Sequence, residues 1–224
     1  MKRTKLDDRM LPHYTKGEEI ANMVTHIIGG SLGIIALVLC VVFSSIKGNV
    51  YGIIGSSIFG IMMIFLYTMS SIYHGLKKTG RAKKVFQVID HCTIFLLIAG
   101  TYTPILLCPI REYNNTLGWS LFAFIWTCAI IGIIFNAIDL KKYKIFSYIC
   151  YLGMGWSILV VGSNFIEMVG VRAFIMILIG GLLYTIGFIF YALGKKVKYF
   201  HMIFHIFCVL GSLMHFLAIL FYII

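Results

Sequence analysis

The sequence predicts an all-α fold: a polytopic seven-transmembrane helix bundle with a cytoplasmic N-terminus and a C-terminus outside the cell. Three observations predict it. The 224 residues are 60% hydrophobic and only 12% charged, whereas soluble domains are about half apolar and about a quarter charged. The apolar residues gather in seven runs, each long enough to cross a hydrocarbon core of about 30 Å with about 20 residues. The basic residues lie mostly in alternate connections between these runs.

Each run is expected to be a helix, because only helices and closed barrels pair every backbone group in lipid. Barrel strands alternate apolar and polar residues over about ten positions, and these runs do not. We expect residues 1–19 to form a short cytoplasmic segment and residues 20–224 to form a single transmembrane domain. The predicted spans are 20–43, 51–74, 86–108, 117–138, 146–166, 172–193 and 200–222.

Glycines and prolines predict where the individual spans pack closely, bend or end. Pairs of small residues predict close helix packing in the first, second, fifth and sixth spans; they are Gly29 and Gly33, Gly52 and Gly55, Gly153 and Gly155, and Gly180 and Gly181. In the third span Pro104 is expected to kink the helix, and Pro109 is expected to end it. The fourth span begins near Trp119 and the seventh follows Tyr199, both typical of the aromatic belt at membrane interfaces.

The distribution of basic residues predicts the orientation. With the connections placed alternately on two sides, sixteen of the nineteen Lys and Arg residues fall on the side of the N-terminus. Only Lys47, Arg111 and Arg172 fall on the other side. This bias places the N-terminus in the cytoplasm of a multi-pass protein of the cell (plasma) membrane. The net charge of +11 therefore reflects topology and attraction to anionic lipid, and nucleic acid is not an expected partner.

Histidines at one membrane face are the candidate functional residues. His201 and His205 are one helical turn apart at the start of the seventh span, so their imidazoles share a face. His74 ends the second span at the same depth, and the three predict a nitrogen site for one zinc ion with a fourth position open. Asp90, near the start of the third span, is placed to act as a base, to orient water or to support a ligand. Ser70 lies one turn before His74 and is the second candidate catalytic residue.

Other interpretations of these residues stand beside the metal site. Histidines at a membrane boundary often only contact lipid headgroups, and histidines with an aspartate can also form a proton relay. His26 lies at a similar depth in the first span. His91 adjoins Asp90 but points away from it, so it is expected to support or pack. His215 lies about 15 Å beyond His205 along the helix, and we expect it to make a buried hydrogen bond.

The same segments resemble a known family. SSIYHGLKKTGRAKKVFQVIDHCTIFLLIAGTYTPILL and HMIFHIFCVLGSLMHF are similar to signature blocks of the bacterial hemolysin III family. That family belongs to the progestin and adipoQ receptor (PAQR) superfamily, which includes the adiponectin receptors. The resemblance runs from about Glu18 to the C-terminus. It implies seven helices, a cytoplasmic N-terminus, zinc on His74, His201 and His205, and contact between Asp90 and the zinc-bound water.

Two functions from different classes follow. The first is a zinc-dependent, ceramidase-like hydrolase of a lipid amide or ester, with Asp90 as general base and Ser70 as a supporting donor. The superfamily's relationship to alkaline ceramidases favours this hypothesis. The second is a non-enzymatic membrane protein, either a pore-forming cytolysin, as the family name implies, or a sensor of membrane state. In that alternative the zinc is a structural clamp between the second and seventh helices.

Overall fold

The computed structural model describes residues 3–162, 164–194 and 196–224. Its helices, with α marking α-helices and η marking 3-10 or π turns, are α1 (Lys16–Ile46), α2 (Val50–Gly75), α3 (Arg81–Ile105), η1 (Leu106–Ile110), α4 (Arg111–Tyr113), α5 (Asn115–Asp139), α6 (Lys144–Trp156), η2 (Ser157–Val161), α7 (Asn164–Val169), α8 (Val171–Leu193), α9 (Phe200–Ala218) and η3 (Ile219–Ile223). The described residues contain no strand. Lys2 and Lys195, two of the cations counted above, lie outside the described residues.

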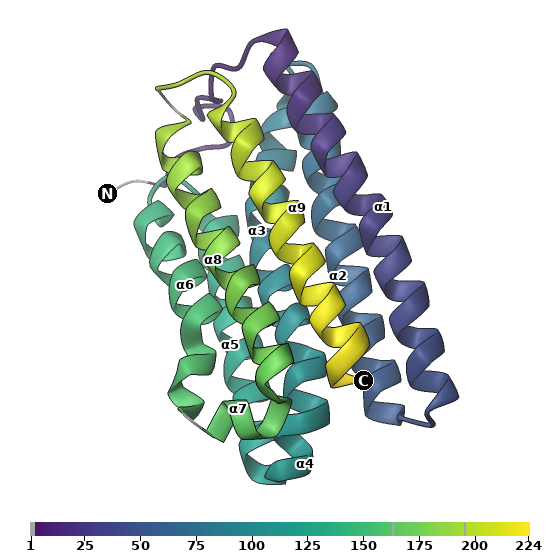
Figure 1. Ribbon diagram of the computed structural model, residues 1–224. Coiled ribbons are helices and arrows are strands. Elements are labelled where there is room, and N and C mark those ends of the chain that lie inside the picture. The colour runs from purple at the N-terminus through teal and green to yellow at the C-terminus, as the bar shows by residue number, and fades with distance from the viewer. Residues whose placement is uncertain (1–2, 163, 195) are drawn as a thin grey trace.

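Within the described residues, seven helices are long and apolar enough to cross a membrane, which confirms the predicted all-α bundle of seven spans. They stand side by side as an elongated bundle (Figure 1). The N-terminal segment, the α2–α3 connection and the α8–α9 connection lie at one end of it, and the short helices α4 and α7 lie at the other. Within the described residues, the basic connections therefore share one end of the bundle.

The helix α3 is the centre of the bundle. In the apolar stretch of the span Arg81–Tyr113, of which α3 is the main part, 78% of the residues are buried, against 28% for α1 and 17% for α8. The outer helices keep Val, Ile and Leu side chains exposed on their outer faces. Exposed Val, Ile and Leu side chains suit a lipid environment, because lipid tails are as apolar as these side chains. This arrangement fits a bundle with a packed interior and a lipid-facing surface.

Side-chain caps fix where several helices begin. Thr15 and Glu18 form a capping box at the start of α1. Asn49 accepts a hydrogen bond from the Gly52 backbone N–H at the start of α2, and Asn114 does the same for Leu117 in α5. Each cap pairs a backbone donor that a helix terminus leaves free.

The prediction that the third helix ends at Pro109 is wrong. The helical path continues from Arg81 to Tyr113, with Pro109 inside the π turn Leu106–Ile110. A π turn bonds five residues apart and is wider than an α turn, so it accommodates a residue that lacks an N–H and crowds the preceding turn. Pro104 lies inside α3, where Gly55 of α2 packs directly against it.

The glycine prediction holds for the pairs in α1 and α2 and for Gly180 in α8, whereas a Cβ at Gly181 would make only an ordinary contact with Trp156. A Cβ at Gly29, Gly33, Gly52, Gly55 or Gly180 would overlap or press on atoms of neighbouring residues, so these glycines allow close packing. A Cβ at Gly153 or Gly155 in α6 would meet no atom within 4 Å. For this pair the prediction of close packing is wrong, because α6 packs only loosely against its neighbours and leaves that face open.

Candidate metal centre

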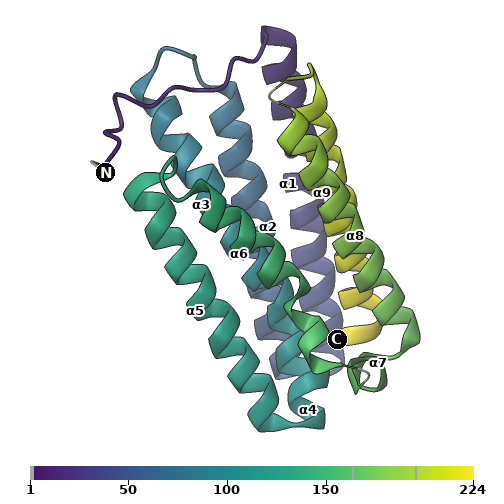
Figure 2. The same ribbon diagram turned by 90° about the vertical axis from the view of Figure 1, so that its left-hand side faces the viewer.

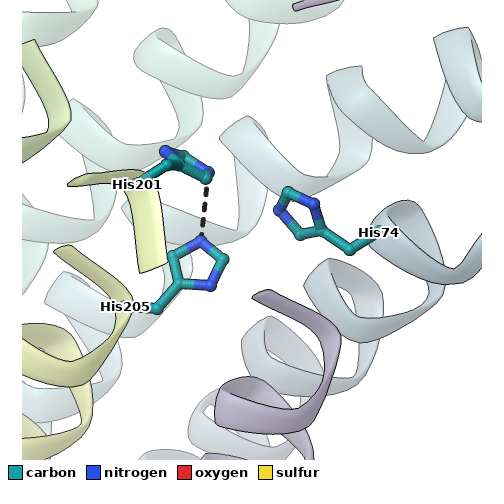
Figure 3. A group of neighbouring side chains, drawn as sticks. All are labelled: His74, His201 and His205. Atoms are coloured by element: carbon teal, nitrogen blue, oxygen red, sulfur yellow. Dashed lines mark hydrogen bonds between the residues drawn. The ribbon is translucent and has the colours of Figure 1, made fainter. Parts of the chain in front are cut away.

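Three imidazoles converge near the end of the bundle where α1 begins. His74 comes from the last turn of α2, and His201 and His205 come from the first two turns of α9. One donor atom from each residue lies within 4.8 Å of the other two, and all three residues are buried. Figure 3 shows the rings pointing toward one another from the two helices. The sequence prediction that these residues meet is therefore confirmed as geometry.

The spacing within the histidine pair suits a tetrahedral ion. The Nε2 atoms of His201 and His205 are 3.1 Å apart. Two nitrogens that each lie about 2.0–2.1 Å from a tetrahedral zinc are about 3.3 Å apart. A small rotation of either imidazole ring would bring the two Nε2 atoms to the spacing of a tetrahedral site.

His74 offers a free nitrogen to the same space. Its Nδ1 lies 2.8 Å from Oε2 of Glu19, to which it donates a hydrogen bond. Its Nε2 is buried and has no hydrogen-bond partner among the described residues. A buried polar atom without a partner is costly, and native structures rarely leave one so. The orphaned Nε2 shows that the residues present fit a metal ion at this position.

His205 is held in a metal-competent tautomer. Its Nδ1 lies 3.2 Å from the backbone oxygen of Asn22, which can only accept a hydrogen bond. Nδ1 therefore carries the proton and Nε2 presents a lone pair toward His201. The ring also stacks on His26, with centroids 3.6 Å apart and an interplanar angle of 15°.

The helix α1 supplies no ligand, yet it orients two of them. Glu19 and Asn22 are three residues apart on its buried face and contact His74 and His205, respectively. From the sequence alone, Glu18, Glu19 and Asn22 are expected to favour the start of the first helix or to contact a cytoplasmic partner or lipid headgroups. The sequence does contain a signal for a different role: Thr15 and Glu18 form the capping box of α1, so the helix start needs no further acid. Glu19 and Asn22 are therefore free to face the interior.

Lys83 of α3 also lies in a place that the sequence did not predict. It falls in the basic connection that sets the topology, but its side chain is almost fully buried. Its Nζ lies 2.9 Å from Oε1 of Glu19 and donates to the backbone oxygens of Leu76 and His74 at 3.1 and 3.3 Å. The ammonium thus neutralises Glu19 and closes the C-terminal turn of α2.

Tyr14 covers the site from the end of the bundle. Its ring stacks on that of His201, with centroids 5.0 Å apart, and lies 6.0 Å from the ring of His74. Burial, with the nearby carboxylates of Glu19 and Asp90, raises the pKa of the Tyr14 phenol. The residue therefore remains a neutral aromatic cover.

The two candidate catalytic residues lie on the wall of one cavity. Ser70 and Asp90, together with His201 and His205, line a cavity of 170 Å³ inside the bundle. Ser70 is buried, and its Oγ has no hydrogen-bond partner among the described residues. Asp90 is not part of the group within 4.8 Å; its Oδ2 lies 3.7 Å from Nδ1 of His91. The structure thus brings Asp90 to the cavity, while the three histidines alone form the tight cluster.

The rest of the cavity wall is overwhelmingly apolar and aromatic. It reaches from His205 past Trp156 to His215, and ten residues of helix α9 cover about 15 Å. Engineered apolar cavities of about 150 Å³ stay dry and admit benzene. This cavity can therefore hold an apolar chain with one end at the histidines.

The remaining histidines have separate roles in the structure. His215 donates from Nε2 to the backbone oxygen of Ile177 at 3.1 Å, which confirms its predicted buried hydrogen bond. His91 donates from Nδ1 to the Gln87 oxygen at 2.8 Å, and its Nε2 lies 3.4 Å from the Tyr191 hydroxyl. Both nitrogens of His26 lack partners among the described residues.

Comparison with known proteins extends across nearly the whole chain. A family model described as "Haemolysin-III related" matches residues 14–216. The chain is 40% identical to "Hemolysin-3" of Bacillus cereus over 207 residues, which cover 92% of each protein. It is 39% identical to "Hemolysin-3 homolog" of Bacillus subtilis (strain 168), over 93% of this chain and 96% of that protein. It is also 27% identical to "Monocyte to macrophage differentiation factor" of Homo sapiens, over 90% and 83%.

Proposed function

The chain belongs to the haemolysin III-related family, and on that premise we propose that it is a zinc-dependent membrane hydrolase of a lipid amide or ester. The ion is held by His74, His201 and His205. One observation carries the proposal: three buried imidazoles present nitrogen atoms within 4.8 Å of one another, and two of them, His201 and His205, line an apolar cavity. An all-imidazole donor set in which His201 and His205 have the nitrogen spacing of a tetrahedral site favours zinc among the common divalent ions.

Bound zinc supplies Lewis acidity, which polarises a carbonyl group and lowers the pKa of water to about 7. Asp90 is the residue that accepts the proton of the attacking water, because it is the carboxylate on the cavity wall. Ser70 donates a hydrogen bond to the carbonyl oxygen as negative charge develops there. Its free, buried Oγ supports this assignment.

The apolar cavity selects the substrate class. Its wall suits an acyl chain and excludes bulk water from the reacting end. An acyl chain that lies along α9 places its carbonyl end beside the histidines. Lipid in the plasma membrane is thus both the solvent of the protein and the source of its substrate, and the basic end of the bundle faces the cytoplasm.

A cytolytic protein with a structural metal is the second candidate, and the names of the two Bacillus relatives, "Hemolysin-3" and "Hemolysin-3 homolog", favour it. In that case the metal clamps α2 to α9, and membrane lysis needs no proton transfer by Asp90. The almost wholly apolar wall of the cavity suits an acyl chain better than a stream of ions. This property of the cavity puts the hydrolase first.

The test is a hydrolysis screen with purified, zinc-loaded protein in lipid vesicles. A panel of fluorescent lipid amides and esters is incubated with the wild type and with Asp90→Asn. Release of fatty acid by the wild type alone is the expected result. Equal release by both proteins, or none from any substrate, would contradict the proposal.

A further inference from the structure

We propose that Glu19, held in place by Lys83, is the positioning residue that makes His74 a metal ligand. The inference rests on the proposed metal site and adds to it a residue from α1, a helix that contributes no ligand. It concerns the tautomer and the direction of one imidazole ring. Three contacts of the Glu19 carboxylate and its neighbours carry it.

The first contact fixes the proton of His74. Oε2 of Glu19 lies 2.8 Å from Nδ1 of His74. A carboxylate accepts and cannot donate, so Nδ1 carries the proton and Nε2 presents its lone pair. Carboxylates placed behind ligand histidines do this at known zinc sites, where they also raise the basicity of the ligand.

The second contact fixes Glu19 itself. Its other oxygen, Oε1, forms an ion pair with Nζ of Lys83 at 2.9 Å. Both side chains are more than nine-tenths buried, so each charge depends on the other. Lys83 also donates to the backbone oxygens of His74 and Leu76, and thereby ties Glu19 to the helical turn that carries His74.

The third contact identifies the group that would compete for Nδ1 of His74 if the carboxylate were absent. The Nδ2 group of Asn22 lies 3.4 Å from the same Nδ1 of His74. An amide N–H is a donor, and it would pair with a bare Nδ1. That pairing moves the ring proton to Nε2 and blocks the nitrogen that faces His201 and His205. Glu19 therefore decides between a binding and a non-binding tautomer.

Glu18 is a matched control in the same helical turn. It is also a buried acid, but it accepts hydrogen bonds from Thr15 and from the Tyr199 backbone N–H and touches none of the three histidines. Replacing Glu18 with Gln removes the same charge from the same turn of α1. Glu19→Gln leaves a single acceptor oxygen for two donors, Lys83 and His74. When that oxygen faces the Lys83 ammonium, the amide NH₂ faces Nδ1 of His74, and the carboxylate behind His74 is lost.

The experiment measures zinc affinity of the purified full-length protein in detergent by competition with a chelator of known affinity. Glu19→Gln is expected to weaken binding about 10- to 100-fold, the range found when outer partners of ligand histidines are removed. Lys83→Met should weaken it in the same direction, and Glu18→Gln should leave it near the wild-type value. The visible spectrum of the cobalt(II) form should change in Glu19→Gln and not in Glu18→Gln, because it reports the ligand set.

The outcomes separate this inference from the metal site itself. Wild-type affinity in Glu19→Gln, or an equal loss in Glu18→Gln, overturns the role of Glu19 while the metal site stands. Failure of the wild type to bind zinc removes the site and the inference together. The melting temperature of each variant in excess chelator shows whether the metal-free protein folds. A variant that melts like the metal-free wild type but binds zinc weakly has kept its fold and lost the orientation of a ligand.

Discussion

The Nε2 atoms of His201 and His205 face each other at 3.1 Å across one turn of α9. Because Nδ1 of His205 donates to the Asn22 oxygen, Nε2 of His205 is an acceptor, and in the metal-free protein His201 must supply the proton between them. A cation that displaces this proton leaves two lone pairs aimed at one point. The pair is thus a hydrogen bond without metal and a chelate with it.

Removal of the metal should destabilise the bundle. The proposed metal ligands come from both α2 and α9. An ion present at about 100 times its dissociation constant would stabilise the folded state by about 2.7 kcal/mol. A strong chelator should therefore lower the melting temperature of the wild type and leave that of His205→Ala unchanged. An unchanged melting temperature in the wild type would contradict a metal that bridges the two helices.

Loss of the Tyr14 ring should speed exchange of the metal. Tyr14 stacks on His201 and covers the site at the end of the bundle. In Tyr14→Ala, stopped-flow measurements should show faster transfer of zinc to a chelator, whereas Tyr14→Phe, which keeps the ring, should match the wild type. Equal rates in all three proteins would mean that the metal leaves by another route.

Asp90→Asn should separate metal binding from catalysis. Asp90 lies outside the tight cluster, so the variant should retain its zinc. Loss of the general base should slow lipid hydrolysis by about 10²- to 10⁴-fold. Erythrocyte lysis that persists in Asp90→Asn would instead support the cytolytic alternative.

Two glycines predict opposite effects of the same substitution. A Cβ at Gly180 of α8 would overlap the imidazole of His215, while one at Gly153 of α6 meets open space. Gly180→Ala should cost about 1–3 kcal/mol in free energy of unfolding by overpacking. Gly153→Ala should cost nothing, since alanine favours a helix by about 1 kcal/mol over glycine. Chemical denaturation in detergent compares them; equal stabilities would show that α8 and α9 are not closely packed.

The features that the sequence predicted correctly are those set by periodicity and depth. Long apolar runs dictate spanning helices, and their alternating direction puts the end of α2 and the start of α9 at the same end of the bundle. The turn-spaced pair His201 and His205 therefore lies at the depth of His74, while the close approach of the three rings depends on how the helices pack. These arguments need only helix geometry and the thickness of a membrane.

The features that were missed depend on which way a side chain turns. Glu19 and Lys83 carry charges that suit the ends of helices, and nothing in their spacing shows that each faces the interior. Their burial follows from the packing of α1 and α3 against α2. The continuation of the helical path from α3 through the π turn η1 past Pro109 was also missed, because the apolar pattern does not distinguish a π turn from the end of a helix.

The most direct test of the account is the metal content of the purified protein, measured by elemental analysis beside His205→Ala and His215→Ala. We expect about one zinc per chain in the wild type and in His215→Ala, whose imidazole lies about 15 Å from His205, and none in His205→Ala. Absence of metal from wild-type protein prepared without chelators, or undiminished metal in His205→Ala, would contradict the central claim that these three histidines form a metal centre.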